Sequence, residues 1–142
     1  MLLAGCARPP APKPAPAVAV AAPAPICNDF SFPIYFETGS DQLSTAAMQV
    51  VSESAERVRG CDVTEVQLLG LADASGTARA NLELSRRRAA SVAAALAAAG
   101  LPQPAFDIGA AGQVGAVAPG GKPEPLRRRT EVVIRASPKP AN

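Results

Sequence analysis

The chain has no histidine and no tryptophan, and it has only one tyrosine and four phenylalanines among its 142 residues. Without histidine, catalytic triads built on an imidazole and metal sites with imidazole ligands are excluded. Three cysteines are too few for a four-thiolate zinc site. Aromatics at 4% and a formal net charge of +2 indicate neither a base-stacking platform nor a nucleic-acid surface. We therefore expect no cofactor, no metal ion and no nucleic-acid partner.

A long apolar run is also missing, since no stretch of the sequence could span a bilayer, and we expect any membrane attachment to come through lipid. Leu-Ala-Gly-Cys at residues 3–6 resembles the bacterial lipobox, in which a signal peptide is cleaved before a cysteine that is then acylated. A whole signal peptide needs an apolar stretch of about 7 to 15 residues. Residues 1–5 are therefore interpreted as the end of a signal peptide whose start codon lies further upstream, with Cys6 as the lipidation site. An accidental match is the alternative.

Residues 6–26 are nearly all alanine, proline and valine, with seven prolines between Pro9 and Pro25. Such a segment has no amphipathic pattern to bury, and its prolines favour an extended spacer of up to about 3 Å per residue. We interpret it as a linker that provides reach. An uninformative disordered terminus is the alternative, and residues 138–142 are expected to be a disordered tail.

The region between, residues 27–137, alternates between strand and helix patterns. The predicted order is a strand at 33–38, a helix from Ser44 to Arg59, a strand opening at Cys61, a helix capped by Thr77, and strands at 105–110 and 130–136. Residues 112–126 are rich in glycine and proline and are expected to form a loop. The sequence thus predicts an α+β fold, a two-layer sandwich with two helices on one face of a mixed four-stranded sheet.

The turn at residues 73–76 joins the second strand to the second helix, and it places Asp73 where the strand stops. In that helix Asn81 and Arg88 are seven residues apart, about 10 Å along the axis on nearly the same face. Both flank an apolar stripe that must face the core, and this stripe consists of Leu82, Ala89, Val92 and Leu96. Arg86 and Arg87 are assigned to the solvated face. Asp73 and Arg88 are the candidates for a binding pair.

Two sequence blocks carry a resemblance to a known family. G-x-x-D-x-x-G followed by N-x-x-L-S-x-x-R-A is present as Gly70, Asp73, Gly76, Asn81, Leu84, Ser85, Arg88 and Ala89. With Phe36 upstream and R-R-x-E-V at residues 128–132 downstream, the chain resembles the OmpA-like peptidoglycan-binding domain over residues 33–136. The resemblance implies the same two-layer fold. The family usually has His-Thr where this chain has Leu71 and Ala72, and Asn where it has Arg127.

In that family the matching aspartate and arginine hold the diaminopimelate of the peptidoglycan stem peptide, which ends in an amino-acid zwitterion. The chemistry suits these residues, because Asp73 can accept from an ammonium while Arg88 grips a carboxylate through two parallel hydrogen bonds. Leu71, Ala72, Asn81 and Arg128 are the expected supporting residues. An internal salt bridge between Asp73 and Arg88 is the alternative.

We expect, accordingly, a non-catalytic lipoprotein on the periplasmic face of the outer membrane that tethers this membrane to peptidoglycan, with other envelope proteins as further partners. A scaffold or interaction module that has lost wall binding is the main alternative, suggested by Leu71, Ala72 and Arg127. A hydrolase using Asp73 with Asp107 or Glu37 is a further one, but no nucleophile and base stand at workable spacing. Arginines 127–129 beside a strand are more typical of ion pairs than of nucleic-acid binding.

Two cysteines stand at the starts of predicted strands, Cys27 just before the first and Cys61 at the second. In an exported protein such a pair is expected to form a disulfide, whereas in the cytosol both would be reduced bystanders.

Overall fold

The computed structural model describes residues 25–117, 120–121, 124 and 127–141. Cys6 and the linker as far as residue 24 lie outside the described residues. The chain forms β1 (Phe30–Tyr35), α1 (Thr45–Arg57), β2 (Asp62–Leu71), α2 (Ala78–Ala98), a short 3-10 turn (Gln103–Ala105), β3 (Phe106–Gly112) and β4 (Arg129–Ser137).

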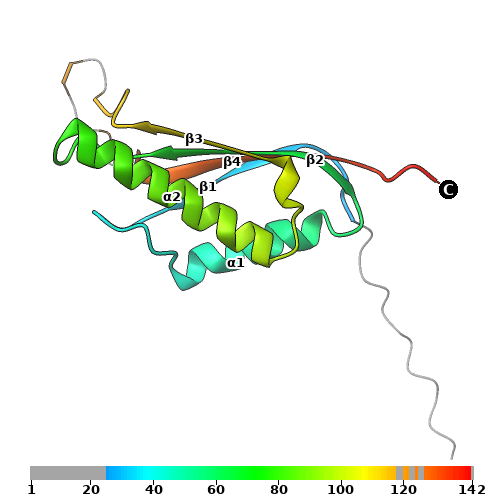
Figure 1. Ribbon diagram of the computed structural model, residues 1–142. Helices are drawn as coiled ribbons and strands as arrows, with labels where there is room; N and C mark the ends of the chain where they lie inside the picture. Colours follow the sequence, from blue (N-terminus) through cyan, green and yellow to red (C-terminus); the bar gives the residue numbers. More distant parts are fainter. Residues whose placement is uncertain (1–24, 118–119, 122–123, 125–126, 142) are drawn as a thin grey trace, which may run out of the picture.

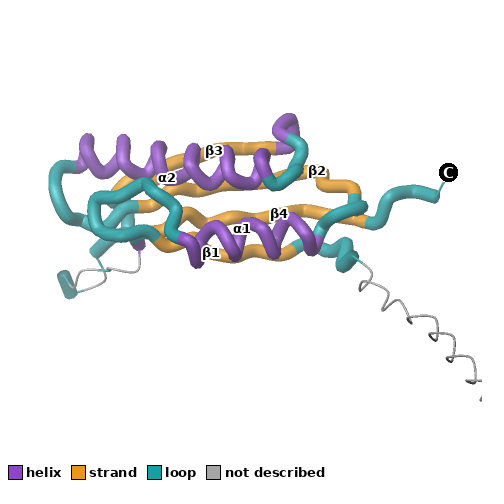
Figure 2. The backbone as a smooth tube through the Cα atoms, turned by 90° about the horizontal axis from the view of Figure 1, so that it is seen from below, coloured by secondary structure: helices purple, strands orange, loops and turns teal. Residues whose placement is uncertain are grey.

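The strands form one mixed sheet in the order β1-β4-β2-β3. β4 is antiparallel to both β1 and β2, and β2 is parallel to β3, as a crossover through α2 requires. Figures 1 and 2 show both helices on the same face of this sheet. The predicted α+β sandwich is therefore confirmed.

Side-chain caps fix the start of each helix. The Ser44 hydroxyl accepts from the amide of Ala47, and the Thr77 hydroxyl accepts from the amide of Ala80, each at 3.1 Å. The predicted caps are thus correct. The first helix ends at Arg57 and not at Arg59, because the chain tightens into a turn that leads to Gly60, whose φ of 83° suits glycine.

The first strand is displaced from its predicted position, since it begins at Phe30 and ends at Tyr35 instead of spanning 33–38. Phe30 and Phe32 pair with Ile134 and Val132 of β4, so their rings face the core side and extend the strand backwards. After Tyr35 the chain leaves the sheet toward α2. The other strands differ from their predicted bounds by one or two residues.

The core lies between the sheet and the helices. On the sheet side it is built from inward-facing residues of β1, β2 and β4, and on the helix side from the apolar stripes of α1 and α2. The fully buried side chains include Ile34, Val51, Val66, Leu68, Val92, Leu96, Val132 and Ile134. Burial of this kind contributes about 1.5 to 3 kcal/mol per large apolar side chain. The predicted stripe of the second helix is confirmed at Ala89, Val92 and Leu96.

The helix α2 approaches β2 and β3 very closely at two glycines. A Cβ on Gly70 would lie 1.9 Å from the carbonyl oxygen of Ser85, and one on Gly112, at φ 55°, would lie 3.1 Å from Cα of Leu82. Because the helix and the strand are so close, the Ser85 hydroxyl can accept from the amide of Gly112 at 3.0 Å while it donates to the carbonyl of Leu82 at 2.8 Å. The start of α2 is thereby fixed against the ends of two strands.

Cys27 and Cys61 form a disulfide, as expected, with their Cα atoms 5.5 Å apart and a sequence separation of 34. It joins the segment before β1 to the residue that precedes β2.

Replacing both cysteines by serine should lower the free energy of unfolding by about 3 to 4 kcal/mol in the loop-entropy account. Urea denaturation of the oxidised parent and of the Cys27→Ser/Cys61→Ser variant measures this cost. A variant as stable as the parent would mean that the crosslink does not restrict the unfolded chain.

In the part of the chain that the structure describes, neither helix has the length and apolar character needed to cross a bilayer.

Candidate ligand-binding site

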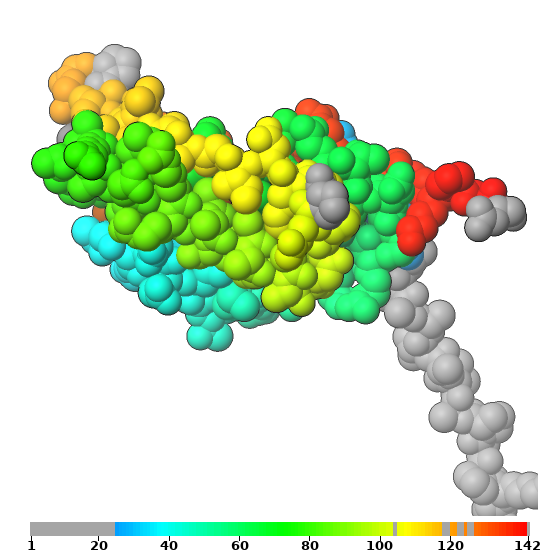
Figure 3. Space-filling model, viewed as in Figure 1, coloured from blue at the N-terminus to red at the C-terminus, as the bar shows by residue number. Residues whose placement is uncertain are grey.

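The candidate site lies where β2 and β3 end and α2 begins. In Figure 3 the loop after β3 and the first turn of α2 gather at one end of the molecule, opposite the C-terminal segment. Asp73 lies in the turn between β2 and α2, and Arg128 is the residue just before β4. Two parts of the chain that are 55 residues apart therefore meet here.

The Asp73 carboxylate is held on both oxygens. Its Oδ1 accepts from the amide of Ser75 at 3.2 Å and from the Ser75 hydroxyl, which fixes the turn. Its Oδ2 forms an ion pair with Nη1 of Arg128 at 3.3 Å. The side chains of Asp73 and Arg128 are 16% and 33% exposed, so the pair is sheltered but open to solvent.

These contacts keep Asp73 charged. Burial alone would raise the pKa of this carboxyl, and it is the largest single influence, but the hydrogen bonds from Ser75 and the nearby Arg128 together outweigh it. The pKa of Asp73 is therefore lowered, and the carboxylate stays ionised at any neutral or mildly acidic pH.

Arg88 is the largest fully buried side chain, with none of its surface exposed. Its guanidinium donates to three backbone carbonyls: Nε to Ser40 at 2.8 Å, Nη1 to Leu71 at 3.1 Å and Nη2 to Glu37 at 3.1 Å. It also lies over the ring of Phe36, with Cζ 5.1 Å from the centroid. Arg88 thus ties the end of β2 and the loop after β1 to the middle of α2.

A binding pair on the surface would be dispensable for folding, but the burial and the contacts of Arg88 predict that the fold depends on it. Removing this guanidinium would take the protein donor from the buried carbonyl of Leu71 and from the partly buried carbonyls of Ser40 and Glu37. The alternative of a direct salt bridge between Asp73 and Arg88 is not found either, because Asp73 pairs with Arg128. Burial lowers the pKa of Arg88, and the charge of Asp73 partly offsets this effect, so the two side chains interact through space.

The supporting residues shape the site in different ways. Asn81 is buried, and its Nδ2 donates to Oε1 of Gln113 at 2.6 Å, which joins α2 to the turn after β3. Leu71 and Ala72 are also buried and contribute backbone only: Leu71 offers its carbonyl to Arg88, and the Ala72 amide donates to Gly112. Neither puts a polar side chain beside Asp73.

Sequence reasoning missed two features of the site. Ser85 was named only as a position of the family motif and was given no role, although its hydroxyl bridges α2 to Gly112. Arg128 appeared only as a supporting residue, although it is the ion-pair partner of Asp73. The positions in the family block were the one signal for Ser85, and no local pattern indicates the Arg128 pairing.

Arg86 and Arg87 occupy the exposed side of α2, as predicted. Arg86 pairs with Glu83 one turn earlier, and Arg87 pairs with Asp41 of the loop after β1 at 2.9 Å. Ion pairs between side chains this exposed contribute about 0 to 1 kcal/mol.

Arg86→Ala and Arg87→Ala should therefore each change the melting temperature by no more than a few degrees, and the affinity for any ligand at Asp73 by less than about twofold. Thermal melts and binding titrations check this. A large loss of binding in Arg87→Ala would show that the Asp41 loop depends on that pair.

The other residues considered from the sequence lie apart from Asp73 or contribute backbone atoms. The described residues contain no group of three or more carboxylate, cysteine or histidine side chains that could hold a metal ion. Asp107 lies beside Gln67 in the middle of β2, not at the turn that carries Asp73. Glu37 contributes its backbone carbonyl to Arg88. Arg127 donates to the carbonyl of Val114 and so holds the loop after β3.

Comparisons with solved structures give the same fold. The OmpA-like domain of FopA1 from Francisella tularensis aligns with a TM-score of 0.66 at 20% identity, over 80% of this chain and 77% of that one. The peptidoglycan-associated lipoprotein from Burkholderia pseudomallei aligns at 0.63 and 22% identity, over 72% and 88%. The C-terminal domain of Helicobacter pylori MotB aligns at 0.60 and 22% identity, over 76% and 85%.

Sequence comparison adds the family. An outer membrane protein of Gluconacetobacter diazotrophicus is 32% identical over 112 residues, which cover 73% of this chain and 30% of that protein. This chain thus spans about a third of the length of that relative. The model of the OmpA family matches residues 35–130, the region that holds both helices, strands β2 and β3 and the site. The chain therefore belongs to the OmpA family.

Proposed function

We propose that this chain is a non-catalytic peptidoglycan-binding protein that recognises the diaminopimelate zwitterion of the stem peptide through Asp73 and Arg88. The observation that carries the proposal is the charge arrangement at the end of β2. One partly exposed carboxylate stands in a sheltered turn, with Arg128 paired to it and Arg88 buried within its electrostatic reach. A zwitterionic ligand can place its ammonium against the carboxylate and its carboxylate against the arginines.

Asp73 is the group that meets the ammonium. Among the described residues its Oδ2 accepts one bond, the 3.3 Å contact with Arg128, which is long for a charged hydrogen bond. A carboxylate oxygen has a second lone pair, so Oδ2 can accept from a ligand ammonium without losing the turn that Ser75 holds on Oδ1.

The ligand carboxylate needs arginine donors. Arg128 is partly exposed and meets the ligand first. Arg88 has five N–H groups and uses three of them on carbonyls of the surrounding chain. Reaching the other two requires the loop at Glu37–Asp41 to shift, because Arg88 is covered. This loop is held by the pair between Asp41 and Arg87 at the surface and by the bonds from Arg88 to the carbonyls of Glu37 and Ser40, so its shift would exchange the bonds of Arg88 for bonds to the ligand.

Binding to isolated sacculi tests the proposal. The full chain should co-sediment with sacculi from a bacterium whose wall contains diaminopimelate, and a soluble stem peptide ending in diaminopimelate should compete. A stem peptide with lysine in the same position lacks the second carboxylate and should compete far less well. Equal competition by both peptides would show that Arg88 and Arg128 do not bind the second carboxylate of the ligand.

A scaffold module that no longer binds the wall is the second candidate, and the burial of Arg88 favours it. Leu71 and Ala72 offer no hydrogen-bonding side chain, and all the contacts of Arg88 given above are internal. A folded chain that stays in the supernatant with every type of sacculus would support this function.

We further propose that Cys6 carries the lipid that attaches the protein to the outer membrane, with the Ala/Pro-rich segment as spacer. Acylation with three chains makes anchoring effectively stable. Mass spectrometry of the protein from its native envelope should show a mature chain that begins at acylated Cys6. A Cys6 that carries a free thiol would contradict the anchor but not the binding site.

A further inference from the structure

We propose that the Cys27–Cys61 disulfide diverts tension on the N-terminal segment past the edge strand β1 and into the central strand β2. The inference rests on the proposed function to the extent that a membrane anchor on one side and the wall on the other would supply the tension. The structural basis is the position of the disulfide relative to the binding site.

The N-terminal segment reaches the domain at one end, and the candidate site lies at the other. Cys61 directly precedes β2, and Asp73 follows the last residue of β2 by two positions. Figure 1 shows β2 running from the disulfide end of the sheet toward the end where α2 begins. A single covalent path therefore leads from Cys27 through Cys61 and along β2 to the site.

Without the disulfide the same pull would enter through β1. This strand is at the edge of the sheet and pairs only with β4, from Phe30 to Tyr35. β2 is held on both sides, by β4 from Asp62 to Gly70 and by β3 from Val66 to Leu71. Without the disulfide, therefore, the pull shears β1 from β4, whereas with it the pull runs along the covalent backbone of β2, which β3 and β4 hold in place.

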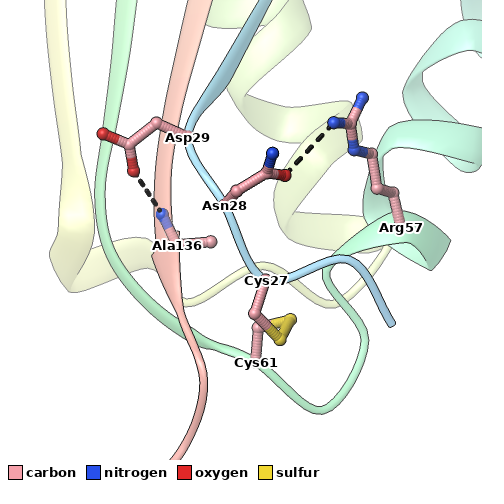
Figure 4. The surroundings of a disulfide bond; sticks show 6 residues. All are labelled: Cys27, Asn28, Asp29, Arg57, Cys61 and Ala136. Carbon is pink, nitrogen blue, oxygen red and sulfur yellow. Dashed lines mark hydrogen bonds between the residues drawn. A yellow bond between two sulfur atoms is a disulfide. The ribbon is translucent and has the colours of Figure 1, made fainter. Parts of the chain in front are cut away.

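Contacts around the disulfide hold the chain in the same place. Figure 4 shows that Asn28 accepts from Nη2 of Arg57 in α1, at 3.2 Å, and that Asp29 accepts from the amide of Ala136 in β4, at 3.1 Å. Asp29 also pairs with Arg135. These contacts are largely exposed and weak, so the disulfide is the element that can transmit force.

Single-molecule pulling tests the proposal on the full chain without any wall ligand. One handle is placed at the N-terminus and the other at Ala74, an exposed residue just after β2, through a bio-orthogonal azide side chain that leaves the cysteines untouched. Each molecule is pulled in its oxidised state, refolded at low force, reduced, and pulled again. The Cys27→Ser/Cys61→Ser variant repeats the reduced state independently.

The reduced molecule should show a force peak when β1 is sheared from β4, whereas the oxidised molecule should show no peak at that force, because its load runs through the disulfide and along the covalent backbone of β2. The oxidised molecule should also extend less, since the disulfide bypasses a sequence separation of 34, or about 120 Å of chain. This difference in length verifies that the bond was closed. A peak at the same force in both states, with the expected difference in length, would overturn the proposal.

A second pair of handles, at Asp62 and Ser137, is the matched control. Both residues are exposed and face each other at paired ends of β2 and β4, so pulling them apart unfolds the sheet by a path that does not pass through the disulfide. Reduction should leave this unfolding force unchanged. If reduction lowers this force as well, the disulfide stabilises the whole domain and does not divert load. Failure to bind sacculi would refute the proposed function and leave these forces as they are.

Discussion

Arg88→Ala should destabilise the domain by about 5 kcal/mol, because it leaves a cavity in place of a fully buried side chain and takes the donor from one buried and two partly buried carbonyls. Small domains have free energies of unfolding of about 5 to 15 kcal/mol, so a large fraction of the variant should be unfolded at 37 °C. Urea denaturation followed by circular dichroism measures the loss.

Two further variants separate the hydrogen bonds from the volume of the side chain. Arg88→Met fills most of the space but donates nothing, and it should recover only the part of the loss that comes from the cavity. In Arg88→Lys all the donors are on a single ammonium nitrogen, which cannot reach the carbonyls of Ser40, Leu71 and Glu37 together. The stability of this variant should therefore lie between those of the parent and Arg88→Ala. Wild-type stability in Arg88→Met would show that the carbonyls find water and that Arg88 is not a structural residue.

Asp73→Asn should reduce binding to diaminopimelate-containing sacculi by a hundredfold or more, while the variant stays folded. The substitution keeps the shape and the hydrogen bond from Ser75, but it removes the charge that meets the ligand ammonium and leaves Arg128 without its partner. A hundredfold loss corresponds to about 2.8 kcal/mol. Quantitative co-sedimentation measures it.

Asp107→Asn is the matched control for this loss. It removes the same charge from an exposed position on β3, beside Gln67 and away from the turn, and it should bind as the parent does. If both variants lose affinity alike, the effect is one of net charge. If neither does, Asp73 is not the ammonium site.

The fold could be predicted because its signals are local. The caps at Ser44 and Thr77 and the stripe of Ala89, Val92 and Leu96 depend on residues within a few turns of one another. Strand bounds were less predictable, since β1 extends back to Phe30 only because β4 supplies partners for it. The spacing of Asn81 and Arg88 correctly placed both beside the buried stripe.

The partners within the site could not be predicted in the same way. Arg88 donates to carbonyls that lie 17 to 51 residues away, and every residue has a carbonyl, so no side-chain pattern marks the acceptors. The pairing of Asp73 with Arg128 depends on the strand order, which brings the start of β4 next to the end of β2. Charge and spacing along α2 alone favoured Arg88 as the partner.

The most direct measurement of the central claim is an NMR titration of the isotope-labelled full chain with a soluble stem peptide that ends in diaminopimelate. We predict that the largest shifts occur at the amides of residues 71–77, at the guanidinium signals of Arg88 and Arg128, and in the loop at 37–41. Shifts confined to the disulfide end of the sheet, or no shifts at ligand concentrations that saturate related binders, would contradict it.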